Sequence, residues 1–126
     1  MILVDTSIWI DHFRHGEPEL NNILKDDRLL IHPAIIGELA LGSLHDRKNV
    51  LALLAAQRKA IVVTHGDVLT MIDRLALFSM GIGYTDSHIL GSVLFTPHAS
   101  LWTRDRRLLS AAEKGGAQLY RPQIAG

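Results

Sequence analysis

Short apolar runs alternate along the chain with longer segments in which apolar residues recur at helical spacing. The short runs predict five strands, at residues 2–4, 29–31, 61–63, 101–102 and 118–120. Between them, apolar residues three and four positions apart predict helices with one buried face. Strands that alternate with helices favour a parallel sheet with helices packed on both of its faces. We therefore expect an α/β fold in a three-layer α/β/α arrangement, with a central, mostly parallel sheet of about five short strands.

Hydroxyl side chains mark the expected starts of several helices. The expected caps are Thr6 or Ser7, Thr64 and Thr85. Thr64 is followed three residues later by Asp67, which resembles a capping box with Asp in place of Glu. From there the apolar spacing continues to Met80, so we expect one helix up to that residue.

One predicted helix carries a charge among apolar residues. Pro33 is expected to open this helix and Gly42 to end it, and the segment between them is apolar nearly all round, which indicates burial. Glu38 lies three positions from Ile35 and one from Leu39, so we expect it to share their face. A carboxylate there indicates either a functional site or an ion pair with a buried arginine.

Three further acids occupy positions that could bring them together with Glu38. Asp5 and Asp105 each follow a predicted strand, and Asp86 falls in the first turn of a predicted helix. The carboxyl ends of parallel strands point to one edge of a sheet, so Asp5 and Asp105 can meet there. Two ionised carboxylates ~4 Å apart repel by up to ~4 kcal/mol at an effective dielectric constant of ~20. Four such groups need a cation or raised pKa values, and all-oxygen ligation suits Mg²⁺ or Mn²⁺.

Each of these acids, taken alone, also has a purely structural interpretation. Asp5 and Asp105 could cap the helices that follow them, and Asp86 would be favourable in the first turn of any helix. The set of four is what favours a metal site.

The same residues carry a resemblance to a known family. Val4-Asp-Thr-Ser7, Ile36-Gly-Glu38, Asp86 and Thr103-Arg-Asp105 resemble the four acidic motifs of the PIN domain, in the same order along the chain. The opening segment, with Trp9, Asp11, Phe13 and Arg14, looks most like the VapC-type toxin ribonucleases of toxin-antitoxin pairs. The resemblance spans the whole chain and implies a single PIN-like domain over residues 1–126.

The resemblance also implies a site and an activity. Asp5, Glu38, Asp86 and Asp105 would bind Mg²⁺ or Mn²⁺ for hydrolysis of RNA by a metal-activated water, leaving 5′-phosphate and 3′-hydroxyl ends. Ser7 and Thr103 would hydrogen-bond the ligating carboxylates. The family further implies a VapB-like antitoxin and a homodimer as partners. His88, close to the third acid, departs from the usual alanine and has no assigned role.

Charge affects where RNA could bind. Thirteen basic and thirteen acidic residues cancel, so any affinity for a polyanion must be local. Arg104, Arg106 and Arg107 form a basic cluster beside the fourth acid, and Arg14 lies one short helix beyond the first. These side chains could contact phosphates at the rim of the site or could simply be solvated. We single out Arg14 and Arg104 as the expected substrate contacts.

The two tryptophans have two interpretations. Trp9 and Trp102 could stack on bases, but their apolar neighbours favour packing in the core.

The composition limits the location of the protein. The chain has no cysteine, which excludes disulfides and thiolate zinc sites and suits a reducing cytoplasm. It also has no run of ~18 apolar residues for a membrane span and no signal peptide at its start. We therefore expect a cytoplasmic protein that makes no use of a membrane.

Three other functions compete with the metal-dependent endoribonuclease. A phosphatase of the haloacid dehalogenase type would need Asp at position 7, where the chain has Ser7. A signalling receiver domain would need an acid on the third strand, and Ile61-Val-Val-Thr64 offers none. The remaining alternative is a catalytically silent PIN-like RNA-binding module, against which the retention of four acids counts.

Overall fold

The computed structural model describes residues 1–122, so the predicted domain of residues 1–126 includes four residues outside the described part. Its elements are β1 (Ile2–Val4), α1 (Thr6–His15), α2 (Pro18–Lys25), β2 (Leu29–Leu30), α3 (Pro33–Ala40), α4 (Arg47–Ala55), α5 (His65–Arg74), α6 (Tyr84–Phe95), β3 (Ser100–Trp102) and α7 (Arg106–Lys114). None of the helices within residues 1–122 has the length and apolar character needed to cross a membrane.

A parallel sheet lies at the centre of the fold. The strand order is β2-β1-β3, and both neighbours run parallel to β1. The register pairs Ile2 with Leu29 and Val4 with Trp102. The predicted α/β fold with a parallel sheet is confirmed, and β1 is buried throughout, as its unbroken apolar run predicts.

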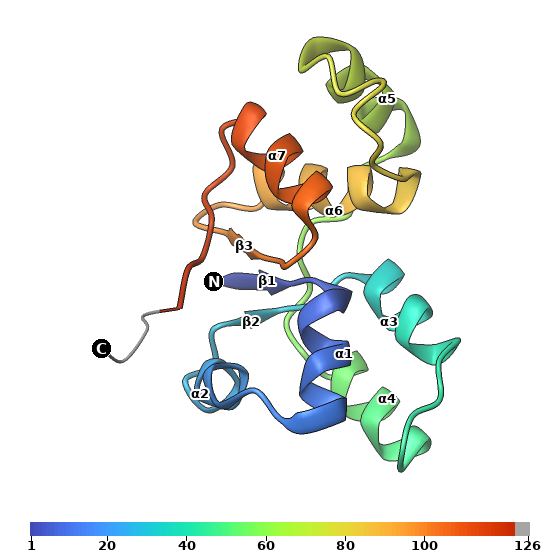
Figure 1. Cartoon of the computed structure of the whole chain (residues 1–126), viewed down its shortest axis with the longest axis vertical. Helices are drawn as coiled ribbons and strands as arrows, with labels where there is room; N and C mark the ends of the chain where they lie inside the picture. The colour runs from blue at the N-terminus through green and yellow to red at the C-terminus, as the bar shows by residue number, and fades with distance from the viewer. Residues whose placement is uncertain (123–126) are drawn as a thin grey trace.

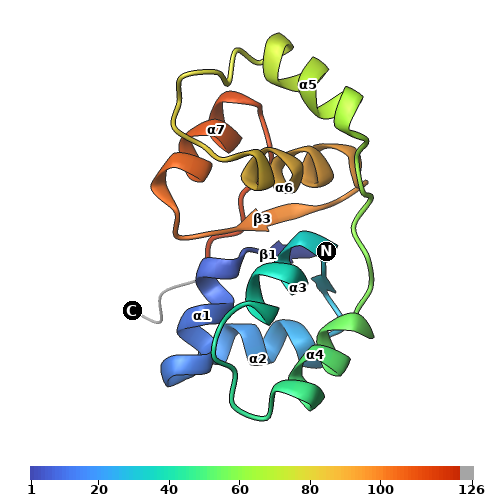
Figure 2. The same ribbon diagram turned by 90° about the vertical axis from the view of Figure 1, so that its right-hand side faces the viewer.

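Helices cover the sheet on two sides (Figures 1 and 2). The helices α1 to α4 lie on one side, while α6 and α7 lie on the other, with α5 packed beyond α6. The core continues from the sheet into both groups of helices. Trp9 and Trp102 are both buried within it, which confirms their assignment to the core over base stacking.

The prediction of five strands is wrong. The structure has three strands within residues 1–122, and the two other predicted strands are absent or reduced to a single bridge. At residues 118–120, only Leu119 forms a bridge, to Leu101. At residues 61–63, Ile61 and Val62 are 47% and 55% exposed, and the Ile61 N–H donates to a side chain, Thr96 Oγ1, at 2.9 Å. Ile61 and Val62 therefore lie on the surface outside the sheet, and of this run only Val63 is buried.

The helix predicted to reach Met80 ends earlier, at Arg74. Its expected start is confirmed, because Thr64 accepts a hydrogen bond from the Asp67 N–H at 3.1 Å. At the other end, Ala76 has a positive φ of 51°, which turns the chain out of the helix. Two bonds close this turn, from the Ala76 N–H to Asp73 O and from the Leu77 N–H to Ile72 O, at 3.2 and 2.9 Å. This is a Schellman motif built on alanine, so the glycine that normally signals it is missing.

Two other helix starts differ from expectation by a few residues. α1 begins at Thr6, with Asp5 in the cap position, and α6 begins at Tyr84 with Gly83 as its cap in place of Thr85. Asp86 still falls in the first turn of α6, as predicted.

The left-handed conformation of Ala76 yields a stability prediction. Replacement by glycine removes the Cβ strain at this position, so Ala76→Gly should raise the free energy of unfolding by about 0.5–1 kcal/mol. Denaturant melts of the two proteins measure the difference. The control is Ala52→Gly, an exposed position inside α4, which should lower the free energy of unfolding by about 1 kcal/mol. A loss of stability in Ala76→Gly would contradict the assignment of the turn.

Candidate active site

Asp5 lies at the carboxyl end of β1, only 6% exposed, and two hydroxyl groups hold its side chain. Thr103 Oγ1 donates to Asp5 Oδ2 at 2.7 Å, and Ser7 Oγ donates to the same oxygen at 2.9 Å. The Asp5 side chain makes no capping bond to α1. The carboxylate is therefore held by the start of α1 and the end of β3 together, and capping does not account for it.

Asp105 serves partly as a structural cap. Its Oδ1 accepts from the backbone N–H groups of Arg107 and Leu108, at 2.9 and 3.1 Å, and so caps α7. Its own N–H donates to Thr103 Oγ1 at 3.0 Å. One hydroxyl thus links Asp105 to Asp5, and the exposed Asp105 keeps its second oxygen outside the capping bonds.

Asp86, in the first turn of α6, is half-buried and close enough to the other acids to respond to their charges. Burial, together with the charges of Asp5, Asp105 and Glu38, raises its pKa from the ordinary 3.8 to about 6. The effect of these three charges on Asp86 indicates that the four predicted acids share one region of the fold.

Glu38 lies at the edge of this group. It is exposed while Ile35 and Leu39 are buried, so the prediction that it shares their face is wrong. Nor is α3 buried nearly all round, since Gly37 is also exposed and Ile36 is only partly buried. The atoms around Glu38 still remove enough water to raise its pKa, and Asp5 raises it further.

Thr6, expected from the sequence only as a possible helix cap, faces Glu38. The Thr6 hydroxyl lowers the pKa of Glu38, although the two groups fall short of full hydrogen-bond geometry and the hydroxyl oxygen has no partner among the described residues. Thr6 lies within the first acidic motif, next to Asp5, which was the available signal for it.

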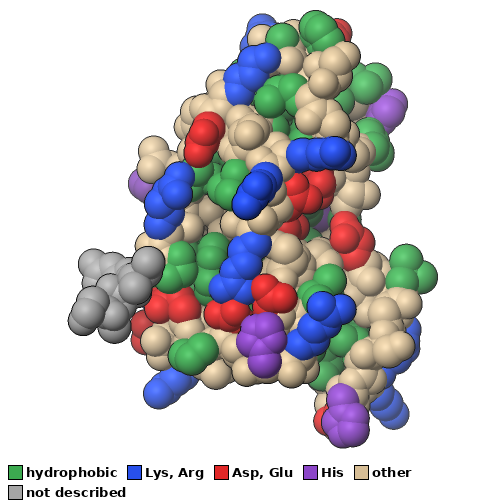
Figure 3. All heavy atoms as spheres, in the orientation of Figure 1, with side chains coloured by type: hydrophobic (Ala, Val, Ile, Leu, Met, Phe, Trp, Pro, Cys, Tyr) green, Lys and Arg blue, Asp and Glu red, His purple; other side chains and the backbone are tan. Residues whose placement is uncertain are grey.

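The four acids together form an all-oxygen set suited to a hard divalent cation. Figure 3 shows acidic side chains grouped on one face of the molecule, with Lys and Arg side chains around them. Within residues 1–122, no three acidic or histidine side chains already converge tightly enough to enclose a cation. The residue types and the raised pKa values fit Mg²⁺ or Mn²⁺, which would relieve the repulsion between the carboxylates.

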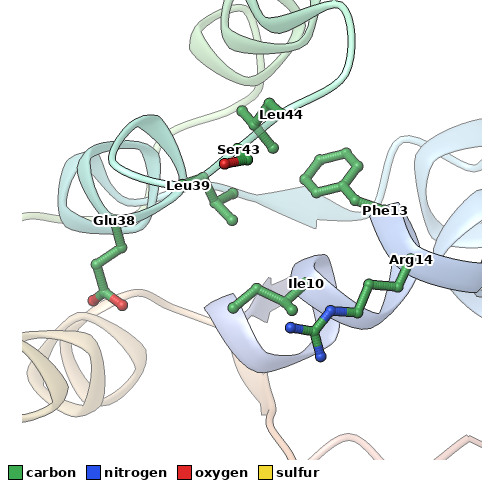
Figure 4. A pocket seen from close by; sticks show the side chains of 8 residues that line it. Ile10, Phe13, Arg14, Glu38, Leu39, Ser43 and Leu44 are labelled. Carbon is green, nitrogen blue, oxygen red and sulfur yellow. The ribbon is translucent and has the colours of Figure 1, made fainter.

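Arg14, predicted to contact substrate, lies beside a pocket that opens next to the acids. The pocket has a volume of about 460 Å³, and Arg14 and Glu38 are its charged lining residues. Figure 4 shows Glu38 reaching in from α3 at one end and Arg14 lying along α1 at the other, with Ile10 between them. The exposed Arg14 side chain makes no ion pair with any of the described residues.

Arg104, the other predicted substrate contact, has two acidic partners. Its NH1 group donates to Asp11 Oδ2 at 2.5 Å and to Glu17 Oε1 at 2.6 Å. Its guanidinium also lies 5.8 Å from the centre of the Trp102 ring. The hydrogen bond from Arg104 and its positive charge hold the pKa of Glu17 below its usual range. The partners lie 93 and 87 residues away in the sequence, so no local pattern signalled them.

His88, which had no assigned role, packs on aromatic rings. It meets Tyr84 edge to face, with ring centres 4.7 Å apart, and lies 6.4 Å from His32. These rings join α6 to the start of α3.

Comparison with known proteins identifies the family. The PIN domain family matches residues 2–114. Ribonuclease VapC32 of Mycobacterium tuberculosis is 47% identical over 119 residues, which cover 94% of this chain and 96% of the relative. The identity is the same for the VapC32 sequences of strains CDC 1551 / Oshkosh and ATCC 25618 / H37Rv.

The match to the PIN domain family, over residues 2–114, includes all four acids from Asp5 to Asp105. The chain therefore belongs to the PIN domain family and is a homologue of the VapC ribonuclease toxins.

Proposed function

We propose that this chain is a Mg²⁺- or Mn²⁺-dependent endoribonuclease that hydrolyses RNA phosphodiester bonds with water, as the toxin of a type II toxin-antitoxin pair. The main support is the gathering of four carboxylates at the carboxyl edge of the sheet in a chain of the VapC family. Asp5, Glu38, Asp86 and Asp105 are the proposed ligands. Mg²⁺ or Mn²⁺ held there would lower the pKa of a water molecule and offset the charge of the phosphate.

The four proposed ligands would differ in role, because hydrogen bonds hold two of them in position and not the other two. Asp5 is oriented by Ser7 and Thr103, and Asp105 by its capping bonds, so each presents one carboxylate oxygen in a fixed direction. Asp86 and Glu38 have raised pKa values, and a bound cation would favour the charged forms of both carboxylates.

We propose RNA, a VapB-like antitoxin and a second copy of the chain as partners, and the cytoplasm, where RNA is present, as the location. Two apolar surfaces support the protein partners. One is the pocket beside Glu38, where Ile10 and Phe13 are each 39% exposed, and an antitoxin seated there would cover the acids. The other surface contains the exposed side chains of Val62 and Phe95, which the hydrogen bond from Ile61 to Thr96 brings near each other. A second copy of the chain could bury this surface.

Cleavage of RNA is the direct test. Purified protein with total cellular RNA and Mn²⁺ should produce discrete new 5′-phosphate ends, mapped by sequencing, and EDTA should remove them. Asp86→Asn should lower the yield of these ends at least about 100-fold, because it removes a proposed ligand. The matched control is Asp73→Asn, an exposed acid on α5, which should cleave like the unmodified protein. Equal cleavage by both variants would refute the proposed metal site.

The hydroxyl groups on Asp5 give a second prediction. Thr103→Val removes the 2.7 Å bond to Asp5 while preserving the shape of the side chain. We expect the affinity for Mn²⁺, measured by calorimetry, to fall about 10-fold to 100-fold. Thr70→Val is the control, because among residues 1–122 the Thr70 hydroxyl bonds only to its own helix, at Gly66 O. An unchanged affinity in Thr103→Val would mean that this bond does not orient a ligand.

The raised pKa of Asp86 predicts how pH changes stability in the absence of metal. Unfolded Asp86 loses its proton near pH 3.8 but the folded protein keeps it up to about pH 6. The folded state therefore holds more protons across this window, so the free energy of unfolding should fall as the pH rises through it. At pH 7, Asp86→Asn should be more stable than the unmodified protein by about 1 kcal/mol, since the half-buried carboxylate is still screened by water.

Denaturant melts in EDTA at pH 4, 5, 6 and 7 measure this effect as the difference between the two proteins. Excess Mn²⁺ should reverse its sign at pH 7, because the cation stabilises only the protein that retains the carboxylate. A difference in EDTA that stays constant with pH would show that Asp86 is not subject to this repulsion.

A further inference from the structure

One arginine beside the acids lies flat on a glycine. Arg107 is the second residue of α7, and its NH1 group points to Gly81 O at 3.4 Å. A Cβ placed on Gly81 would lie only 3.2 Å from Arg107 Cδ and 3.3 Å from its Nε and NH1 atoms. The backbone at Gly81 also has a φ of +80°, a conformation that favours glycine. The Arg107 side chain can pack this closely on residue 81 because glycine has no Cβ.

This position places the Arg107 side chain between the elements that carry two of the acids. Gly81 lies in the turn that leads into α6, which carries Asp86 in its first turn. The Arg107 backbone N–H bonds to Asp105 Oδ1 at 2.9 Å, at the start of α7. The guanidinium therefore spans from the α7 start to the α6 start, on the Asp86 and Asp105 side of the site.

The arginines near the acids differ in whether a carboxylate already neutralises them. Arg104 is bound by Asp11 and Glu17. Arg107, like Arg14, is exposed and makes no ion pair with any residue in the range 1–122. An exposed guanidinium with no acidic partner keeps its donors available for a phosphate.

Two of the unpaired arginines, Arg14 and Arg107, lie on opposite sides of the acidic group. Arg14 shares a pocket with Glu38, on the side of α1 and α3. Arg107 is on the side of α6 and α7. A single strand of RNA laid over the acids would meet one guanidinium before the reacting phosphate and the other after it.

We propose that Arg107, seated on Gly81, is an RNA phosphate-binding residue, and that it and Arg14 hold the RNA backbone across the acids from opposite sides. Arg104 then belongs to the scaffold: with Asp11 and Glu17 it ties the end of β3 to α1 and α2. This inference rests on the proposed ribonuclease function and adds to it the path of the substrate.

The test compares two arginine variants in RNA binding. A fluorescent single-stranded RNA of roughly 16 nucleotides is titrated in Mg²⁺, with Asp86→Asn present in every protein so that the RNA stays intact. Arg107→Ala should weaken binding about tenfold and lower the slope of log affinity against log salt by about 0.7, the value for one phosphate contact on a single strand. Arg107→Lys, which keeps the charge, should restore the slope.

Arg58→Ala is the matched control. It removes the same exposed side chain, but Arg58 pairs with Asp27, just before β2, at the opposite edge of the sheet from the acids. It should leave affinity and slope within about twofold of the parent, as for a charge remote from the RNA. If Arg107→Ala binds like Arg58→Ala, the inference is wrong.

Two further measurements separate the possible failures. Gly81→Ala should weaken binding in the same direction as Arg107→Ala but by less, because the added Cβ forces the Arg107 side chain to shift by a few tenths of an ångström, and a thermal melt shows whether the variant is folded. Cleavage of RNA by the unmodified protein in Mn²⁺ is measured separately. Absence of cleavage refutes the proposed function, whereas cleavage with an Arg107→Ala variant that binds normally refutes only the role of Arg107.

Discussion

The alignment of β1 with β3 is the constraint on which the rest of the site depends. Val4 pairs with Trp102, and the Asp5 N–H donates to Trp102 O at 2.9 Å, so the residues that follow the two strands lie side by side. Thr103 can therefore reach Asp5 across 98 residues of sequence. Burial of an anion is costly unless hydrogen bonds compensate it, and the two hydroxyl donors supply that compensation. The same bonds fix the starts of α1 and α7 relative to each other.

The fold holds the four acids with unequal firmness. Asp5 and Asp105 each commit one oxygen to structural hydrogen bonds, whereas Asp86 and Glu38 accept none from residues 1–122 with full geometry. This difference explains how the neighbouring carboxylates can raise the pKa of Asp86 and still not converge on a common point with it. Hydrogen bonds place two of the acids, whereas the other two have no such restraint from residues 1–122. The repulsion that remains is a cost in stability that the site imposes on the fold.

Local patterns predicted the elements whose causes are local. The buried run of β1, the Thr64 cap and the placement of Asp5 and Asp105 after strands all follow from a few adjacent residues. The failures have causes that a short window does not contain. Residues 61–63 have the composition of a strand, but no strand in the described part of the chain pairs with them, and the Ile61 N–H bonds to Thr96 instead.

Two other errors came from signals that are absent or misleading. α5 ends on a left-handed alanine, so the apolar spacing ran on past the true end of the helix. Glu38 was placed by its distance from Ile35 and Leu39, but adjacent helix positions differ by about 100° and the carboxylate turns outward. Its membership of the site therefore depends on where α3 packs against α1, which sequence spacing does not express.

Arginines that are neighbours in the sequence do not necessarily contribute to the same positively charged surface. Arg104 and Arg107 belong to one cluster in the sequence, yet one turns back to Asp11 and Glu17 and the other lies over Gly81. Their contribution to a local positive potential differs accordingly, because a paired guanidinium contributes little to a distant phosphate. A chain of zero net charge can then still attract a polyanion to an acidic site, provided that unpaired cations flank the acids and a bound divalent ion offsets their charge. The balance is set by which arginines the fold neutralises, and that depends on long-range packing.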